Sequence, residues 1–250
     1  MQAALLDAIT AGDLAAVQAA LGCGADLNAA GPFARTPLHH AAAKCAKPEI
    51  VDWMIDLGAA LDARDGDGRT PLHRANSVSI DPLLRHHADV RLVDLEGNTA
   101  LHVAAEQSPD MCRQLVAAGV AVDARNHAGL TPLHCAVLEG RRPVIELLVG
   151  LGANVNAATQ TDYRHKWHYI AWDVQGLERS VRAGSTPLSL ARQRHRETYW
   201  TSGRQYTDIA GYLASKGALA PAGGRRAWII GCVLLVSIVV AWWFLKTRPA

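Results

Sequence analysis

Residues 68–73 read Gly68-Arg69-Thr70-Pro71-Leu72-His73, and most of the chain is a series of variations on this stretch. Thr-Pro-Leu-His recurs at residues 36–39 and 131–134, and in altered form at residues 99–102 (Thr-Ala-Leu-His) and 186–189 (Thr-Pro-Leu-Ser). These residue types are typical of the beginning of a helix, because Thr caps free backbone N–H groups, Pro fits the first helical position and Leu begins an apolar face. The sequence therefore predicts an array of similar helical units.

The motif returns from Thr36 to Thr70 and from Thr99 to Thr131 after roughly 33 residues, which is the period of an ankyrin repeat. The units also end in turn signals such as Gly152-Ala153-Asn154-Val155-Asn156. Over about residues 5–218 the chain resembles the ankyrin repeat family. This resemblance implies an all-α solenoid of about six helix-turn-helix units with hairpin fingers, and protein binding along the concave face formed by fingers and first helices.

We expect the repeat domain to occupy residues 1–220, with an insertion at residues 158–183. The insertion carries the run Tyr163-Arg164-His165-Lys166-Trp167-His168-Tyr169, in which polar and β-favouring aromatic residues alternate. This pattern predicts an extended hairpin arm that projects from the row of fingers. Two roles for its aromatic side chains remain open: they bind a partner, or they fold back and cover the last repeat.

The composition changes after the repeat domain. Residues 221–226 form a short linker rich in Pro, Gly and Arg, and residues 227–245 contain no charged side chain. A run of about 20 apolar residues has the length needed to cross a membrane. Tryptophans lie at both ends of this run, as they do in interfacial aromatic belts. The sequence predicts one C-terminal transmembrane helix, Ala227–Leu245, followed by a short tail at residues 246–250.

The location of the repeats is predicted from the remainder of the chain, because basic residues flank the apolar run almost equally. The first residues lack the basic and then apolar layout of a secretory signal. We therefore expect a tail-anchored, single-pass membrane protein whose repeats face the cytoplasm. Arg is far more frequent than Lys, and Ala is abundant, so we expect the membrane to be a bacterial inner membrane.

Composition argues against several classes of function. The formal net charge of +2 gives no reason to expect a nucleic-acid partner, and the five cysteines form no Cys-x-x-Cys pair. No phosphate-binding Gly loop, nucleophile elbow or pair of catalytic carboxylates is present, so we expect no enzyme activity, no cofactor and no small-molecule substrate. The resemblance implies a structural role for the motif histidines His39, His73, His102 and His134. A metal-dependent enzyme built on His165 and His168 is a weaker alternative.

We expect a protein partner to be bound by finger tips, first-helix starts and the arm. The predicted contact residues are Phe33, Arg35, Asp67, Arg69, Glu96, Asn98, His127, Leu130, Tyr163, Arg164, Trp167, Tyr169 and Trp172. Exposed Trp, Tyr and Arg are enriched at interface hot spots, which favours the arm. In this interpretation the anchored module recruits or inhibits its partner at the membrane surface.

The basic last repeat supports an alternative function. The cluster Arg192-Gln193-Arg194-His195-Arg196, together with Arg204, lies shortly before the apolar run. It could contact anionic lipid headgroups, each basic residue adding up to about 1 kcal/mol, and would then make the chain a lipid-sensing peripheral regulator. The other possibility is a solvated helix end with no lipid contact.

Overall fold

The computed structural model describes residues 1–45, 47–165, 179–197 and 203–219. Within these ranges the chain forms short helices, one 3₁₀ turn and one small β-hairpin. The elements are α1 (Gln2–Ala11), α2 (Leu14–Gly22), η1 (Pro32–Ala34), α3 (Pro37–Lys44), α4 (Pro48–Asp56), α5 (Pro71–Arg74), α6 (Ile80–Arg85), α7 (Ala100–Ala104), α8 (Pro109–Ala117), α9 (Pro132–Leu138), α10 (Arg142–Gly150), β1 (Tyr163–His165), β2 (Arg179–Val181), α11 (Pro187–Glu197) and α12 (Gly203–Ser215).

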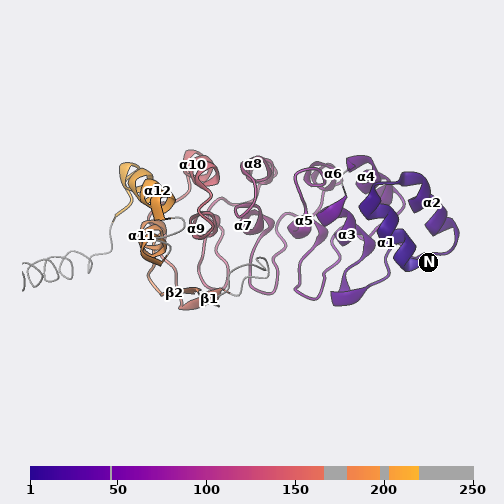
Figure 1. Ribbon diagram of the computed structural model, residues 1–250, viewed down its shortest axis with the longest axis horizontal. Coiled ribbons are helices and arrows are strands. Elements are labelled where there is room, and N and C mark those ends of the chain that lie inside the picture. Colours follow the sequence, from indigo (N-terminus) through magenta and orange to yellow (C-terminus); the bar gives the residue numbers. More distant parts are fainter. Residues whose placement is uncertain (46, 166–178, 198–202, 220–250) are drawn as a thin grey trace, which may run out of the picture.

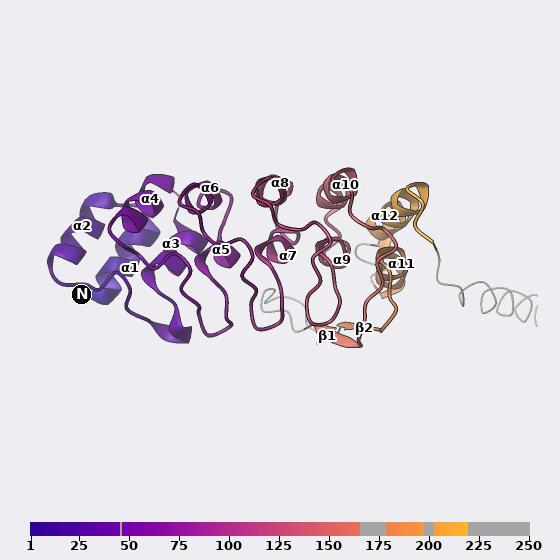
Figure 2. The ribbon, with the colours of Figure 1, turned by 180° about the vertical axis from the view of Figure 1, so that it is seen from behind.

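The helices stack in two parallel rows, with the finger loops as a third row beside them (Figure 1). The first helices of successive repeats, from α1 through α3, α5, α7 and α9 to α11, each contact the next. The second helices α4, α6, α8 and α10 form the outer row and also contact in sequence. The view from behind shows the same elongated arrangement (Figure 2). The described part of the chain is therefore a solenoid of helix pairs, as the sequence predicts.

The Thr-Pro-Leu-His motif begins the first helices α3, α5 and α9, and Thr-Ala-Leu-His begins α7. In all four cases Thr is the N-cap residue and forms a capping box with the His three positions later. The Leu of each motif is buried. The local preference of the motif thus fixes both where each first helix begins and which face it turns to the core.

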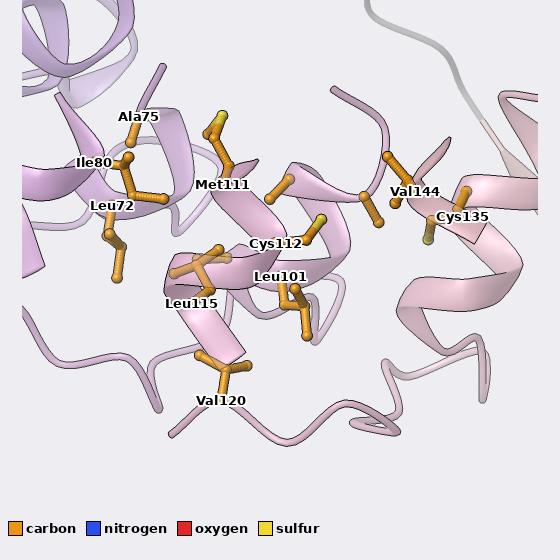
Figure 3. Packing of buried hydrophobic residues seen from close by; sticks show 14 of the residues in the cluster. Leu72, Ala75, Ile80, Leu101, Met111, Cys112, Leu115, Val120, Cys135 and Val144 are labelled. Atoms are coloured by element: carbon orange, nitrogen blue, oxygen red, sulfur yellow. The ribbon is translucent and has the colours of Figure 1, made fainter. Parts of the chain in front are cut away.

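The core is a continuous apolar cluster that runs from Leu5 to Ala218. Leu101 of α7 lies beside Cys112 and Leu115 of α8 in the middle of the array (Figure 3). Small alanines, such as Ala104 and Ala105, are also buried there and permit close approach of neighbouring helices. Each repeat buries its apolar face against its neighbours, so stability is shared along the stack.

The third repeat departs from its neighbours at the end of its outer helix. Its α6 has six residues, whereas α4, α8 and α10 each have nine. At the turn after the outer helix Gly58, Gly119 and Gly152 have positive φ, and His87 holds the corresponding place with φ 63°. A side chain in this left-handed conformation is strained, because its Cβ crowds the following carbonyl oxygen. Ala88 follows and is buried, like Ala59 and Ala153 in the neighbouring units.

The base of the predicted arm is an antiparallel hairpin. Tyr163 of β1 pairs with Val181 of β2, and His165 pairs with Arg179. The backbone at Thr159 bonds across the insertion, donating to Ser185 O at 3.0 Å and accepting from Gly184 N at 2.8 Å. These two hydrogen bonds join the beginning and the end of the insertion, so the insertion forms a lengthened finger with a closed base. Residues 166–178, which include the predicted tip of the arm, lie outside the described ranges.

In the last repeat, Arg192 and Arg194 lie within a helix and not in a turn between helices. Helix α11 continues through these residues to Glu197 and packs against α12. No helix within the described ranges is both long and apolar enough to cross a membrane. The predicted span Ala227–Leu245, its linker at residues 221–226 and the tail at 246–250 lie outside those ranges.

Candidate protein-interaction surface

The finger tips are joined by backbone hydrogen bonds from each finger to the one before it. Gly66 N donates to Phe33 O at 2.6 Å, and Leu95 N donates to Asp67 O at 3.0 Å. The pattern continues with His127 N to Glu96 O at 3.0 Å and Gln160 N to Ala128 O at 3.1 Å. Because every tip is bonded to its neighbour, the tips form one ordered row instead of independent loops.

A buried side chain closes each finger turn. Asp65 Oδ1 accepts from the backbone N–H groups of Asp67 and Arg69, both at 2.9 Å. Asp94 repeats this arrangement with Glu96 N and Asn98 N, at 2.9 and 2.8 Å. In the next finger Asn126 Oδ1 accepts from Ala128 N and Leu130 N at 3.0 and 2.9 Å. The three turns therefore have the same backbone shape although one of them lacks the negative charge.

Arginines neutralise the two buried carboxylates. Arg74 donates to Asp65 Oδ2 from both Nε and Nη2, at 2.9 and 2.7 Å, and Arg35 Nε lies 3.6 Å from the same oxygen. Arg69 Nε donates to Asp94 Oδ2 of the following finger at 3.1 Å. Burial opposes ionisation of Asp65, but the hydrogen bonds from Arg74 and from the Arg69 backbone outweigh it, and the pKa of Asp65 is lowered.

The motif histidines connect consecutive repeats. In His102 the Nδ1 atom accepts from Thr99 N at 3.1 Å, so the proton of the neutral ring resides on Nε2. Nε2 donates to Leu130 O of the next finger at 3.0 Å. His39, His73 and His134 make the equivalent bonds to Arg69 O, Asn98 O and Ser185 O. These are structural bonds, which agrees with the role that the family resemblance implied.

Burial disfavours the charged form of these rings. It lowers the pKa of His102 and of His134 to about 4, and it lowers the pKa of His39 and His73 as well. In the neutral ring, Nδ1 accepts a hydrogen bond from the backbone N–H of the motif Thr. Protonation of Nδ1 would place two N–H groups face to face and break this bond. The row of fingers therefore depends on four neutral imidazoles.

The predicted finger residues fall into three groups. Phe33, Asp67, Glu96 and His127 are exposed at the tips, with Phe33 74% exposed. Arg35 and Arg69 are partly exposed, but their guanidinium groups form ion pairs with Asp65 and Asp94.

Asn98 and Leu130 are buried and do not belong to an interaction surface. Leu130 is 1% exposed, and Asn98 bonds Asp94, Glu96 and Asn126. Both residues precede the motif Thr, where the backbone carbonyl accepts from a motif histidine and the side chain turns toward the next finger. Neither side chain therefore lies on the exposed face of the finger row.

The arm residues are only partly placed. The backbones of Tyr163 and Arg164 lie in β1 at the base of the hairpin, one finger beyond His127. Trp167, Tyr169 and Trp172 lie outside the described ranges, as does His168 of the metal-site alternative. The two roles of the arm aromatics therefore remain predictions.

Leu95 is an exposed tip residue that the sequence prediction missed. It is 68% exposed, one position before Glu96, and its backbone takes part in the tip-to-tip hydrogen bonds. A signal was available, because the matching tip positions hold Gly66 and His127, so that Leu95 is the one large aliphatic residue among the three.

Two glutamates of the first helices also escaped the sequence prediction. Glu106 follows α7 and Glu139 caps α9, and Arg141 Nε of the latter repeat donates to Glu106 O at 2.8 Å. Burial, and then the charge of Glu139, raise the pKa of Glu106 to about 8. Glu106 therefore carries a proton at neutral pH in the folded chain.

The basic cluster of the last repeat does not form one exposed surface. Arg192 is exposed, but Arg194 is 5% exposed, lies over the ring of Tyr206, and donates from Nη2 to Leu138 O at 3.3 Å. Arg194 joins α11 to the preceding repeat and α12, so it cannot face lipid headgroups. The side chains of Arg196 and Arg204 lie outside the described part of the chain.

The chain has several relatives among characterised sequences. It is 28% identical to the NF-kappa-B p105 subunit of Gallus gallus over 156 residues, covering 56% of this chain and 15% of the relative. It is 39% identical over 89 residues to NF-kappa-B inhibitor alpha of Sus scrofa, covering 31% of this chain and 27% of the relative. Protein PhlB of Serratia liquefaciens is 35% identical over 123 residues, covering 48% of this chain and 44% of the relative. The matched segments thus span less than half the length of each of these relatives.

A family model described as ankyrin repeats in three copies matches residues 5–81 and again residues 76–159. Together the two matches cover more than half of the chain. They include the three finger turns and the four capped helices described above. The chain therefore belongs to the ankyrin repeat family, whose repeats are non-enzymatic protein-interaction modules.

Proposed function

We propose that this chain holds a protein partner at the cytoplasmic surface of a membrane and thereby recruits or inhibits it. The observation that carries the proposal is the ordered row of finger tips, in which exposed side chains project from a backbone that is bonded from one finger to the next. Such a row presents contact groups at little entropic cost, because the backbone is already ordered before binding.

The names of the relatives support a protein partner and one mode of action. NF-kappa-B inhibitor alpha is named as an inhibitor, and its repeats match part of the array described here. By analogy, the partner of this chain would be a protein whose activity is blocked or localised by binding.

Membrane attachment is proposed from the sequence. Residues 227–245 have the length and the uncharged composition of a transmembrane helix, with tryptophans at the ends. A short linker separates this run from α12, so the proposed anchor would keep the array close to the bilayer. The proposed location is a bacterial inner membrane with the repeats in the cytoplasm.

The experiment compares the full chain with a chain that ends at Gly224. We expect the full chain to remain with membranes after alkaline carbonate extraction and the shortened chain to be released. Photo-cross-linking from position 96, at a finger tip, should trap a protein partner, whereas cross-linking from position 57, at the end of α4, should not. Release of the full chain by carbonate would reject the anchor, and equal trapping from both positions would reject the finger row as the binding surface.

The exposed side chain of Arg192 supports the lipid-sensing alternative, whereas Arg194 is buried and does not support it. Vesicle flotation of the chain that ends at Gly224 tests it directly. If this chain floats with anionic vesicles at low salt and not at high salt, the last repeat contacts lipid. If it stays at the bottom of the gradient in both cases, protein binding is the remaining function.

A further inference from the structure

We infer that the edge formed by the first three finger tips binds a protein segment in which two apolar side chains flank a lysine or arginine. This inference rests on the proposed function and names the chemistry of the partner. The surface, here called the Phe33–Leu95 edge, consists of Phe33, Gly66, Asp67, Leu95 and Glu96. Two exposed apolar groups mark its ends, and carboxylates lie between and beside them.

The backbone holds Phe33 in an exposed position at a cost. Phe33 and Ala34 both have left-handed backbones, with φ 58° and 54°. Gly66 of the next finger makes this possible, because a Cβ at residue 66 would lie 3.0 Å from Phe33 O. Arg35 covers one face of the ring at 5.4 Å, which leaves the side chain 74% exposed. Backbone strain of this kind clusters at active sites, ligand clamps and switch regions.

Leu95 occupies the other end in a similar way. A Cβ at Gly68 would lie 3.0 Å from Leu95 Cγ, so the absence of a side chain there gives Leu95 its place. Leu95 N donates to Asp67 O, as Gly66 N donates to Phe33 O, which makes one path across the three fingers. Because Gly66 and Asp67 are adjacent in the chain and are bonded to Phe33 and Leu95 in turn, the backbones of the two apolar anchors are at most roughly 15 Å apart. An extended segment of about four or five residues spans this distance.

The exposed tip positions between and beside the anchors carry carboxylates, and the nearby Arg64 donates to the backbone carbonyls of Gly68 and Val93. Arg35 and Arg69 form ion pairs with the buried carboxylates of Asp65 and Asp94, and Arg74 serves both Asp65 and Asp67. The carboxylate of Asp67 nevertheless remains 50% exposed. Glu96 is exposed beside Leu95 and accepts a hydrogen bond from Asn98 at 3.2 Å.

A cationic side chain of a partner would find two carboxylates on this edge. An acidic segment or a nucleic-acid backbone would be repelled by the same two groups. The edge thus combines apolar anchors with a charge preference, and this combination identifies the class of partner segment.

The test uses the full chain and labelled peptides with two leucines four positions apart, which places both on one face of an extended segment. One peptide carries lysines between the leucines, and the matched peptide carries glutamates there. Fluorescence anisotropy should show binding of the lysine peptide and no binding of the glutamate peptide. Replacement of both anchors, Phe33→Ser with Leu95→Ser, should weaken the lysine peptide about tenfold or more, as expected for hot-spot groups. Leu57→Ser removes an equally apolar, 52% exposed side chain at the end of α4 and should change nothing.

A charge exchange makes the test more specific. Glu96→Lys should weaken the lysine peptide and strengthen the glutamate peptide, whereas Glu146→Lys on the outer helix α10 should do neither. Equal affinity for the two peptides, no binding of either peptide, or binding insensitive to the two anchors would each overturn the inference. These results would leave the proposed function intact if cross-linking at the membrane still traps a protein. Conversely, peptide binding at this edge without any trapped protein would reject the proposed function and keep the inference.

Discussion

Acidification should weaken the fold through the motif histidines, and the Glu106→Gln variant should reveal the effect most clearly. His102 and His134 have pKa values of about 4 in the folded chain, against 6.5 for an unperturbed histidine. As the pH falls, the histidines of the unfolded chain take up protons before those of the folded chain. The contribution of the neutral histidines to the free energy of unfolding is therefore complete above pH 6.5. It declines as the pH falls toward 4.

The magnitude follows from the two pKa values. At pH 5 an unfolded histidine is almost fully protonated, whereas a ring with a pKa of about 4 is not. The difference costs about 2 kcal/mol per ring, and therefore about 4 kcal/mol for the pair. His39 and His73 add to this loss with the same sign. Domains have total stabilities of about 5–15 kcal/mol, so the loss is a large part of the whole.

Glu106 acts in the opposite direction in the native chain. Its pKa is raised to about 8, so its ionisation opposes folding above the usual pKa of a glutamate. As the pH falls from 7 to 5, this unfavourable contribution is relieved by about 2–3 kcal/mol and masks part of the histidine effect. Glu106→Gln removes the titration while keeping the size of the side chain.

The measurement is urea unfolding at pH 7 and pH 5, followed by the helical circular dichroism signal. We expect the variant to lose about 4 kcal/mol between the two values and the native chain to lose only about half as much. At pH 8 the variant should be more stable than the native chain. A variant whose stability is unchanged from pH 7 to pH 5 would refute the proposal that neutral imidazoles hold the repeats together.

Three further predictions concern single positions, and each is checked against a matched change. His87→Gly should raise the free energy of unfolding by about 1 kcal/mol, because glycine relieves the left-handed strain; Gly119→Ala, the reverse kind of change, should lower it in the same urea assay. Arg74→Met should lower stability by about 3–5 kcal/mol, since it leaves Asp65 buried without its main cation, whereas Arg113→Met at an exposed pair should change it by less than about 1 kcal/mol. Alkylation by iodoacetamide at pH 8 should modify the exposed Cys23 in the folded chain and spare Cys112, because burial raises the pKa of the Cys112 thiol to about 12. Mass spectrometry of the peptides measures the two rates. Equal rates for both thiols would contradict the prediction.

Features that depend on nearest neighbours in the chain could be predicted well. The motif Thr caps its helix, and the motif His reaches back to the same residue, so the positions of α3, α5, α7 and α9 follow from local chemistry. The continuation of α11 through Arg192 was not predicted, because its support comes from α12 and from Leu138 of the preceding repeat. Such contacts join residues that are far apart in the sequence.

The sequence by itself determined the repeat architecture, the family and the expectation of a protein partner, because period, capping and apolar spacing are local properties. The tertiary structure decided which finger residues face solvent. Arg69, Asn98 and Leu130 hold the same place in successive turns, yet one is paired to the next finger, one lies in a buried amide network and one is in the core. Each outcome depends on the side chain that the neighbouring finger places opposite. These are contacts between neighbouring repeats, so they become apparent only in the stacked structure.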